Sequence, residues 1–292
     1  MSIWWEVSTV NKLLNGSFTR LWKNKVFWIE MAVMPLWTAI MLISKYYDTV
    51  RVSELNYSLD DFIFRNLPYM GALCAIFTSL FLGTDYSDGT IRNKLVVGHS
   101  RQALYLSNAI VCVAAGIMVH AAWILSVLAI GVPLFGWFEG GTLTFLTYLL
   151  VSVFMLAALA SILTMISMLV QSKAASAVIT LLVFFLLVAL AGFSYNRLSE
   201  PEMNSGGIEI RTTDSGDVEY IQHDKPVPNP NYVSGNLRKA LEFIVNFLPT
   251  GQGILLSVGK AAQPLLMPLY SLIVTMITLV AGIMLFRRKD LK

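Results

Sequence analysis

Long runs of apolar residues, separated by short polar segments, dominate the pattern of the chain. A helix that crosses a bilayer needs about 20 mostly apolar residues. Six segments meet this requirement and predict six transmembrane helices, at residues 26–44, 67–84, 103–131, 142–170, 174–194 and 265–286. The third and fourth runs are longer than the hydrocarbon thickness requires, so we expect these helices to tilt or to extend beyond it.

The composition supports a membrane protein. Apolar residues make up 56% of the chain and charged residues only 13%, whereas soluble domains carry about 25% charged residues. The sequence therefore predicts an all-α polytopic membrane protein. It excludes a soluble Rossmann enzyme and a porin-type barrel, whose strands would appear as short alternating segments. The two cysteines, Cys74 and Cys112, lie inside apolar runs, so a disulfide framework is not expected.

The positions of the positive charges predict the orientation. With six spans both termini fall on one side, and that side carries twelve of the 21 Lys and Arg residues. These twelve lie within roughly 50 residues, and loops dense in Lys and Arg stay in the cytoplasm. We therefore expect a multi-pass protein of the cell membrane with cytoplasmic N and C termini.

Residues 1–25 precede the first span. Within them, 3–22 carry apolar residues at three-to-four spacing, which predicts an amphipathic cytoplasmic helix lying in the membrane interface before the first span. Docking on a specific partner is the alternative role. Residues 26–194 then contain the first five spans.

Residues 195–264 form one larger extracellular loop between spans five and six. The polar part, 199–235, predicts turns or a short hairpin. An amphipathic helix is expected at 236–248, ended by Pro249, before an apolar stretch on or dipping into the outer leaflet. Glycines interrupt that stretch: Gly251, Gly253 and Gly259. Residues 265–292 hold the sixth span and a basic cytoplasmic tail.

Motifs for catalysis are missing. The three histidines are scattered, without metal-ligand spacing, and no Gly-x-Ser-x-Gly elbow occurs. The nearest approach to a phosphate loop, from Gly253 to Lys260, has one residue too many, and Ala261 replaces the magnesium-binding Ser or Thr. We expect neither an enzyme nor a metal site in this chain.

Two polar side chains inside the predicted spans are candidates for a translocation path. Glu30 lies in the inner half of span one, where a buried carboxylate needs a partner or water. The alternative is an interfacial Glu30 close to Arg20, Lys23 or Lys25. His120 lies in span three, and the alternative to a functional role is a packed, hydrogen-bonded histidine.

The polar segment near 85–101 is the most informative one. Gly89 permits a turn, and Thr90 is expected to cap a short helix that continues into Ile91 and Leu95. A short helix of this kind suits a groove on a partner protein. The alternative is a surface loop held to anionic headgroups by basic side chains, namely Arg92, Lys94 and Arg101.

The run from Gly83 to Arg92 resembles the acidic-aromatic-x-x-Gly-Thr-Ile-Arg segment of ABC-2 type transporter permeases, although Asp85 stands where that family commonly has Glu. Phe247 to Gly251 is similar to the Leu-Pro segment before the family's sixth span. Phe286 to Asp290 is similar to its C-terminal ending. The resemblance implies that the segment after span two is a coupling helix contacting an ATPase, with these residues: Asp85, Tyr86, Asp88, Gly89, Thr90, Ile91, Arg92, Asn93 and Lys94.

The resemblance also implies partners and activity. The chain is similar to bacterial permeases that export antimicrobial peptides and phenol-soluble modulins. We therefore expect a subunit of an ATP-driven exporter in the bacterial plasma membrane. A second permease chain, in a homodimer, and a separate cytoplasmic ABC ATPase that holds ATP and magnesium would complete it. The expected cargo is an amphipathic peptide or another hydrophobic compound, and nucleic acid is not an expected partner. One alternative is a sensor or immunity protein that binds an extracellular peptide through 195–264. An integral membrane enzyme is disfavoured, because the sequence shows no catalytic site.

Overall fold

The computed structural model describes residues 2–52, 57–204, 208–212, 218–222 and 226–290. Within these residues, six helical segments are long and apolar enough to cross a membrane, which confirms the predicted fold class. They are Lys25–Arg51 (α2), Asp60–Ser87 (α3, Asp60–Ile63, with α4, Leu67–Ser87), Arg101–Phe135 (α6), Gly141–Leu169 (α7), Lys173–Ser199 (α8) and Met267–Arg288 (α11).

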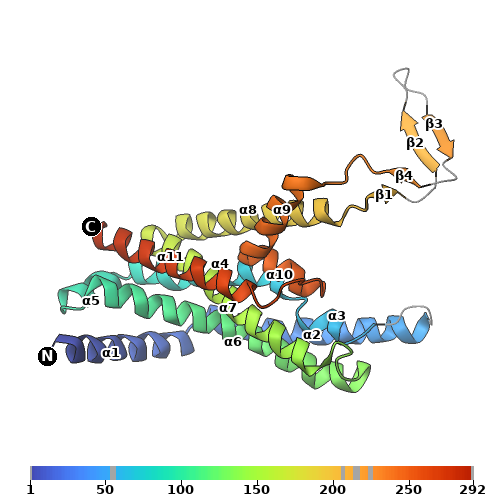
Figure 1. Ribbon diagram of the computed structural model, residues 1–292. Coiled ribbons are helices and arrows are strands. Elements are labelled where there is room, and N and C mark those ends of the chain that lie inside the picture. The colour runs from blue at the N-terminus through green and yellow to red at the C-terminus, as the bar shows by residue number, and fades with distance from the viewer. Residues whose placement is uncertain (1, 53–56, 205–207, 213–217, 223–225, 291–292) are drawn as a thin grey trace.

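Further helices precede or connect these spans. The remaining helices are α1 (Ser2–Trp22), α5 (Thr90–Val96), α9 (Gly235–Phe247) and α10 (Pro249–Ser257). The spans lie side by side in one bundle, and Figure 1 shows both termini and α5 at the same end of it. The even number of spans explains this arrangement, because each crossing reverses the direction of the chain.

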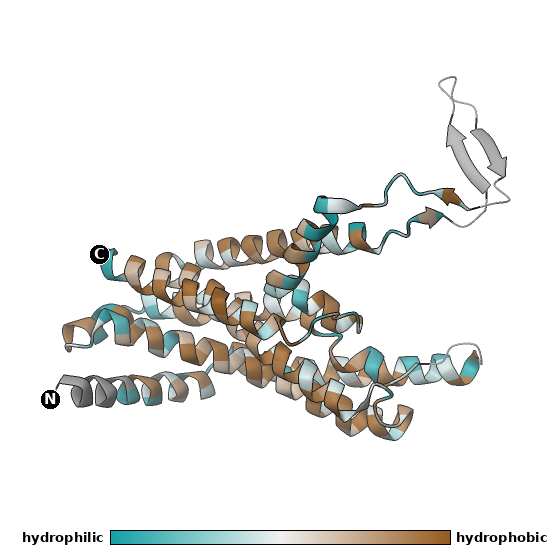
Figure 2. Cartoon of the chain, in the orientation of Figure 1, coloured by the Kyte–Doolittle hydropathy of each residue, from teal (hydrophilic) through white to brown (hydrophobic). Residues whose placement is uncertain are grey.

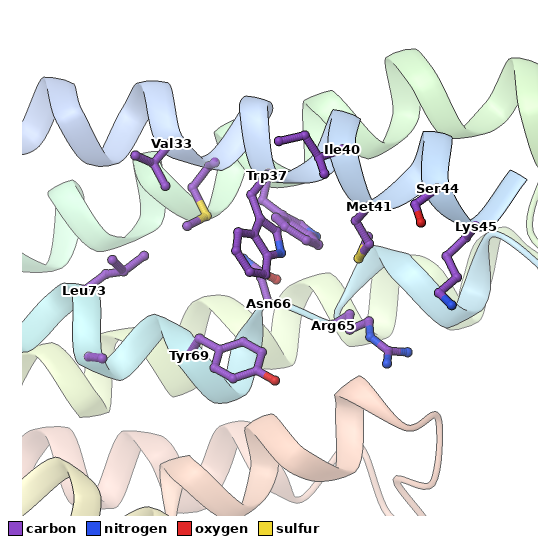
Figure 3. Close-up of a pocket in the computed structure, with 13 residues that line it drawn as sticks. Val33, Trp37, Ile40, Met41, Ser44, Lys45, Arg65, Asn66, Tyr69 and Leu73 are labelled. Atoms are coloured by element: carbon purple, nitrogen blue, oxygen red, sulfur yellow. The ribbon is translucent and has the colours of Figure 1, made fainter. Parts of the chain in front are cut away.

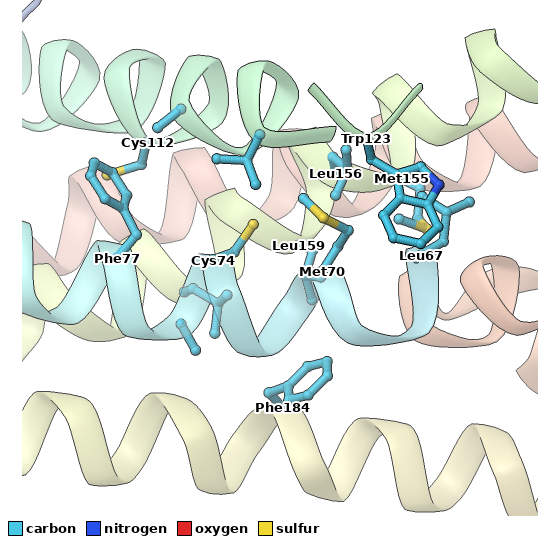
Figure 4. Packing of buried hydrophobic residues seen from close by; sticks show 14 of the residues in the cluster. Leu67, Met70, Cys74, Phe77, Cys112, Trp123, Met155, Leu156, Leu159 and Phe184 are labelled. Atoms are coloured by element: carbon cyan, nitrogen blue, oxygen red, sulfur yellow. The ribbon is translucent and has the colours of Figure 1, made fainter. Parts of the chain in front are cut away.

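The helix α4 occupies the centre of the bundle. It packs against α7 and α6 on one side and α8 on the other, and Figure 4 shows Cys112 of α6 and Phe184 of α8 on opposite sides of it. Met70, Cys74 and Phe77 fill this core together with Leu159 of α7 and Phe184 of α8. By contrast, α2, α8 and α11 leave large apolar side chains exposed, and apolar residues predominate along the helices of the bundle in Figure 2. Exposed apolar surface of this extent is expected where a helix faces lipid.

The segment after α9 differs from the sequence prediction. Pro249 does end α9, but it is also the first residue of α10, where its missing N–H costs no hydrogen bond. Gly251 and Gly253 do not interrupt the stretch, because they lie inside α10. A side chain at Gly251 would clash with the preceding turn, since a Cβ there would lie 2.8 Å from Val245 Cα. Gly251 therefore allows α9 and α10 to fold back tightly on each other, whereas Gly253 faces Met155 of α7 and Leu67 of α4.

A buried glutamine holds α10 within the bundle. Gln252 donates hydrogen bonds from Nε2 to the carbonyls of Asn246 (2.9 Å) and Met267 (3.2 Å), and its Oε1 accepts one from Ser271 Oγ (2.8 Å). The helix contacts α4, α7 and α8, so it enters the bundle instead of lying on its surface. Non-helical backbone at membrane depth requires such protein surroundings.

Short strands occupy part of the predicted hairpin region. Strand β2 (Ile208–Thr212) pairs antiparallel with β3 (Val218–Gln222), and β1 (Met203–Asn204) pairs antiparallel with β4 (Val227–Pro228). In Figure 1 these strands lie beyond the end of α8, away from the helices.

The helix α1 follows the predicted amphipathic pattern over the side chains that the structure describes. Leu13, Ser17 and Leu21 recur at i+4 spacing and are buried, while Lys12 and Asn15 are exposed. This face of α1 packs on α6, and Figure 1 shows the two helices running alongside each other. The placement of α1 in the membrane interface stays a prediction, and the side chains of residues 3–10 lie outside the described set.

Candidate functional site

The turn between α4 and α5 depends on Gly89. Its φ of 66° lies in the left-handed region, which side chains disfavour, so a glycine suits this position. This residue is the N-cap of α5, and no side chain caps the helix. The prediction that Thr90 caps α5 is therefore wrong, because Thr90 is already the first helical residue. The chain reverses direction at Gly89 and presents the seven-residue α5 at the end of the bundle that carries the termini.

The helix α5 has one anchored side and one exposed side. Ile91 is only 1% exposed and belongs to the apolar core, so it attaches α5 to the bundle. Arg92 and Asn93 are exposed, and Val96 and Val97 are 81% and 79% exposed. Val96 ends α5 and Val97 follows it, and exposed apolar residues beside an arginine suit a surface that contacts a partner protein or the membrane.

A buried ion pair joins α1 to the base of α5. The Arg20 guanidinium of α1 pairs with the Asp85 carboxylate near the end of α4, and Asp85 is only 2% exposed. The same guanidinium lies over the Phe81 ring, 3.9 Å from its centroid. Burial lowers the pKa of Arg20 to about 10, and that of Lys94 to about 8 with a smaller contribution from the Arg20 charge. The N-terminal helix is thereby connected to the α4–α5 junction.

The end of α11 is attached to the start of α6 through Arg101, the first residue of α6. Its Nη1 donates hydrogen bonds to the carbonyls of Phe286 (3.2 Å), Arg287 (3.1 Å) and Lys289. Cationic side chains stabilise the unsatisfied carbonyls at a helix C-terminus in this way. The half-buried Arg101 thus binds the end of α11, which disfavours its role in holding a loop on lipid headgroups.

Lys289 completes this connection. Its Nζ donates hydrogen bonds to Tyr86 Oη and to the carbonyl of Met168, both at 2.9 Å, and Tyr86 Oη itself donates to Met168. Lys289 also lies over the Tyr86 ring. The ends of α4, α7 and α11 are therefore joined at one point. We call Tyr86, Arg101, Met168 and Lys289 the C-terminal clamp.

Burial lowers the pKa of Lys289 from 10.5 to about 8, which predicts a pH dependence of stability. Below pH 8 both folded and unfolded states keep the proton. Between pH 8 and 10.5 only the unfolded state does, so the free energy of unfolding should rise with pH. We expect the apparent Tm of the protein in detergent to rise between pH 7.5 and 9.5, and to rise less in the Lys289→Met variant than in the wild type. The exposed Lys12→Met is the matched control, and an unchanged pH profile in Lys289→Met would contradict the assignment.

A cavity of about 360 Å³ opens beside α5. Its lining comes from the α4–α5 junction and from the turn after α7: Asp85, Tyr86, Ser87, Gly89, Ile91, Arg92 and Gln171. Gln171 also donates a hydrogen bond to the Asp290 carbonyl (2.9 Å), so the turn is joined to the C-terminal tail. The cavity therefore lies between the exposed helix and the C-terminal clamp.

The structure places Glu30 inside the bundle. It shares the buried face of α2 with Phe27 and Met34, and only 6% of it is exposed. No ion pair joins Glu30 to Arg20, Lys23 or Lys25, all of which the structure describes, and its depth in the membrane stays a prediction. Arg20 is instead taken by Asp85, and Oε1 of Glu30 has no hydrogen-bond partner among the described groups.

His120 is packed and hydrogen-bonded. Its Nδ1 lies 3.0 Å from Asn66 Nδ2, and its Nε2 lies 3.1 Å from Ser152 Oγ, which donates its own proton to the Leu149 carbonyl. A neutral imidazole protonated on Nε2 satisfies both contacts. Because Asn66 precedes α4 at the end away from the termini, whereas Glu30 lies near the start of α2, the structure does not bring the two path candidates together.

Among the residues described, the fold and this junction define a polytopic helical membrane protein that exposes a short helix at the end carrying its termini. Residues 13–187 match the family described as ABC-2 family transporter protein. The match covers more than half of the 292 residues and includes the α4–α5–α6 junction. The chain therefore belongs to the ABC-2 transporter family. No curated protein matches the chain in a sequence comparison.

Membership has direct consequences for the chain. Proteins of this family are membrane subunits that do not themselves catalyse a reaction, and they work with an ABC ATPase. The chain is thus a multi-pass membrane transport subunit. Sequence reasoning located α5 but missed the C-terminal clamp and the Arg20–Asp85 pair. The signal in the sequence was a basic residue close to a helix end, as for Arg101 and Lys289. The partners of these residues lie far away in the chain: Arg101 bonds carbonyls 185 to 188 residues away, and Lys289 bonds groups 121 and 203 residues away.

Proposed function

We propose that this chain is the permease subunit of an ATP-driven exporter and that α5 is its coupling helix. The observation that carries the proposal is the division of α5 into a buried anchor, Ile91, and an exposed face with Arg92, Val96 and Val97. A cytoplasmic ATPase would bind this exposed face. Its ATP and magnesium would be held entirely by that partner.

The connections at the base of α5 supply a mechanism. ATP-driven closure of the ATPase would displace α5, and the buried Ile91 would transmit the displacement into the bundle. The Arg20–Asp85 pair would carry it to α1, and the C-terminal clamp would carry it to α7 and α11. Because packed helices move as rigid elements, a small displacement at α5 would become a rearrangement of the spans. Two permease chains would enclose the path of the cargo, an amphipathic or antimicrobial peptide or another hydrophobic compound.

Affinity purification of the chain from native membranes tests this function. We expect a soluble ABC ATPase to co-purify in a stoichiometric amount, and its activity to depend on residues 85–95. A matched preparation with α5 replaced by a glycine-serine linker of equal length should lose the ATPase. Absence of an ATPase after crosslinking would overturn the proposal and favour a sensor or immunity protein.

The orientation in the bacterial plasma membrane is part of the proposal, because the ATPase can act only if α5 is cytoplasmic. Both termini lie at the same end of the bundle as α5, so they would be cytoplasmic too. We expect alkaline phosphatase fused after Glu202 to be active outside and the same enzyme fused after Lys289 to be inactive. The opposite result at either position would contradict this topology.

A further inference from the structure

A lateral groove separates α2 from the start of α4, at the end of the bundle away from the termini. It has a volume of about 660 Å³, within the usual range of ligand sites. The helix α2 packs mainly on α6 and approaches α4 only loosely, which leaves this space open. Met34, Asn66 and Trp123 are buried residues of its lining, and the exposed Trp37, Ile40 and Tyr69 line its open side.

The groove is charged at one end only. Figure 3 shows Lys45 and Arg65 at one end, and Val33 and Leu73 at the other. The lining contains no Asp or Glu among the residues that the structure describes. Lys45 does contact Asp48 at 2.9 Å, but exposed ion pairs are weak, so its ammonium can also bind a second anion. The guanidinium of Arg65 suits a phosphate, which it can bind through two parallel hydrogen bonds.

The depth of these cations matches a lipid headgroup. Lys25 begins α2, and at 1.5 Å per residue Lys45 lies about 30 Å further along, one hydrocarbon thickness away. The two lysines therefore bracket the apolar core of the membrane. Arg65 joins Lys45 at the headgroup level of the leaflet away from the termini, while the apolar part of the groove extends toward the middle of the bilayer.

One buried acceptor in the groove also lacks a partner. Asn66 is 4% exposed and donates through Nδ2 to His120, but its Oδ1 accepts no hydrogen bond among the described groups. A buried acceptor left without a partner is costly. This one belongs to a residue of the groove's inner wall.

We propose that this groove binds an anionic phospholipid, with an acyl chain against Trp37 and Trp123 and the phosphate at Lys45 and Arg65. The groove is suited to a lipid because it opens sideways on exposed apolar residues of α2 and can be filled from within the bilayer. The cationic end disfavours a cationic peptide as its occupant, since like charges would meet without compensation. The lipid site does not require an ATPase.

Native mass spectrometry of the purified chain tests the site. The chain is released from nanodiscs that contain equal amounts of phosphatidylglycerol and phosphatidylcholine, and the retained lipids are counted. We expect at least tenfold enrichment of phosphatidylglycerol for the wild type and none for the Lys45→Gln/Arg65→Gln variant. The Arg51→Gln variant is the matched control, because Arg51 lies at the same end of α2 but outside the groove.

A second readout places the lipid in the groove. Brominated acyl chains quench the fluorescence of nearby tryptophans. Brominated phosphatidylglycerol should therefore quench the tryptophan fluorescence of the chain more than brominated phosphatidylcholine does. This difference between the two lipids should be smaller in the Trp37→Phe variant. Equal retention of both lipids, or unchanged enrichment in the double variant, would overturn the proposal. Disulfide-linked dimers of Ile40→Cys would assign the groove to a second copy and would also overturn it. Because the chain is measured alone, failure here leaves the ATPase co-purification unaffected.

Discussion

The Asp85→Ala variant should lose about 3 kcal/mol of the free energy of unfolding, because it leaves the partly buried Arg20 guanidinium without its counter-charge. The loss should be concentrated at the α1–α4–α5 junction, where Asp85 is the ion-pair partner of Arg20. We expect earlier proteolytic release of α1 and a lower apparent Tm in detergent. Stimulation of the ATPase should fall as well, since the base of α5 would no longer be held.

Two controls separate the ion pair from a general effect of charge removal. Asp88 is exposed three residues further along, and Asp88→Ala should leave stability within about 0.5 kcal/mol of the wild type. The Arg20→Met/Asp85→Leu variant removes both charges and should recover much of the loss, because no buried charge remains uncompensated. Equal destabilisation by Asp85→Ala and Asp88→Ala would contradict a specific role for the pair.

The Arg92→Glu variant should weaken binding of the ATPase at least tenfold, about 1.4 kcal/mol, while the apparent Tm of the isolated chain stays unchanged. Arg92 is exposed on α5 beside the exposed Val96 and Val97, and arginines in such surroundings often dominate a protein interface. Binding is measured between the purified chain in nanodiscs and the ATPase that co-purifies with it. Lys239→Glu reverses an exposed charge on α9 and should have no effect.

Ile91 provides the contrast within the same helix. Ile91→Ser removes a buried anchor, so it should lower the apparent Tm as well as coupling. Arg92→Glu should affect coupling alone. If the two variants gave the same pair of effects, the division of α5 into an anchored side and a contact side would be wrong.

The comparison of α5 with the C-terminal clamp shows where sequence reasoning succeeds. The α4–α5 turn was predictable because Gly89 follows the polar Ser87 and Asp88 shortly after an apolar run ends, and a turn is encoded by neighbouring residues. The segment's resemblance to permeases also lies within ten consecutive residues. Arg101 and Lys289 act on carbonyls and a phenol from distant parts of the chain, and no local pattern records such contacts.

The exact ends of helices were also difficult to predict from the sequence. Thr90 has the residue type of an N-cap, but Gly89 takes that position because only it adopts the left-handed turn readily. Gly251 and Gly253 resemble helix breakers in sequence, yet they lie inside α10, and at Gly251 the close approach of Val245 leaves no room for a side chain. The first case reflects the backbone freedom of glycine, whereas in the second a tertiary contact outweighs local propensity.

The sequence by itself determined the spans, the shared side of the termini and the transporter family. Bilayer thickness sets the length of each apolar run, and the requirement that backbone groups be paired in lipid leaves helices as the solution. Only the tertiary structure decided which polar groups meet: Arg20 with Asp85, Lys289 with Tyr86, and Asn66 with His120. It also decided that α2 and α4 leave a groove between them. Packing between helices depends on the shapes of facing side chains, which the order of residues along one helix does not specify.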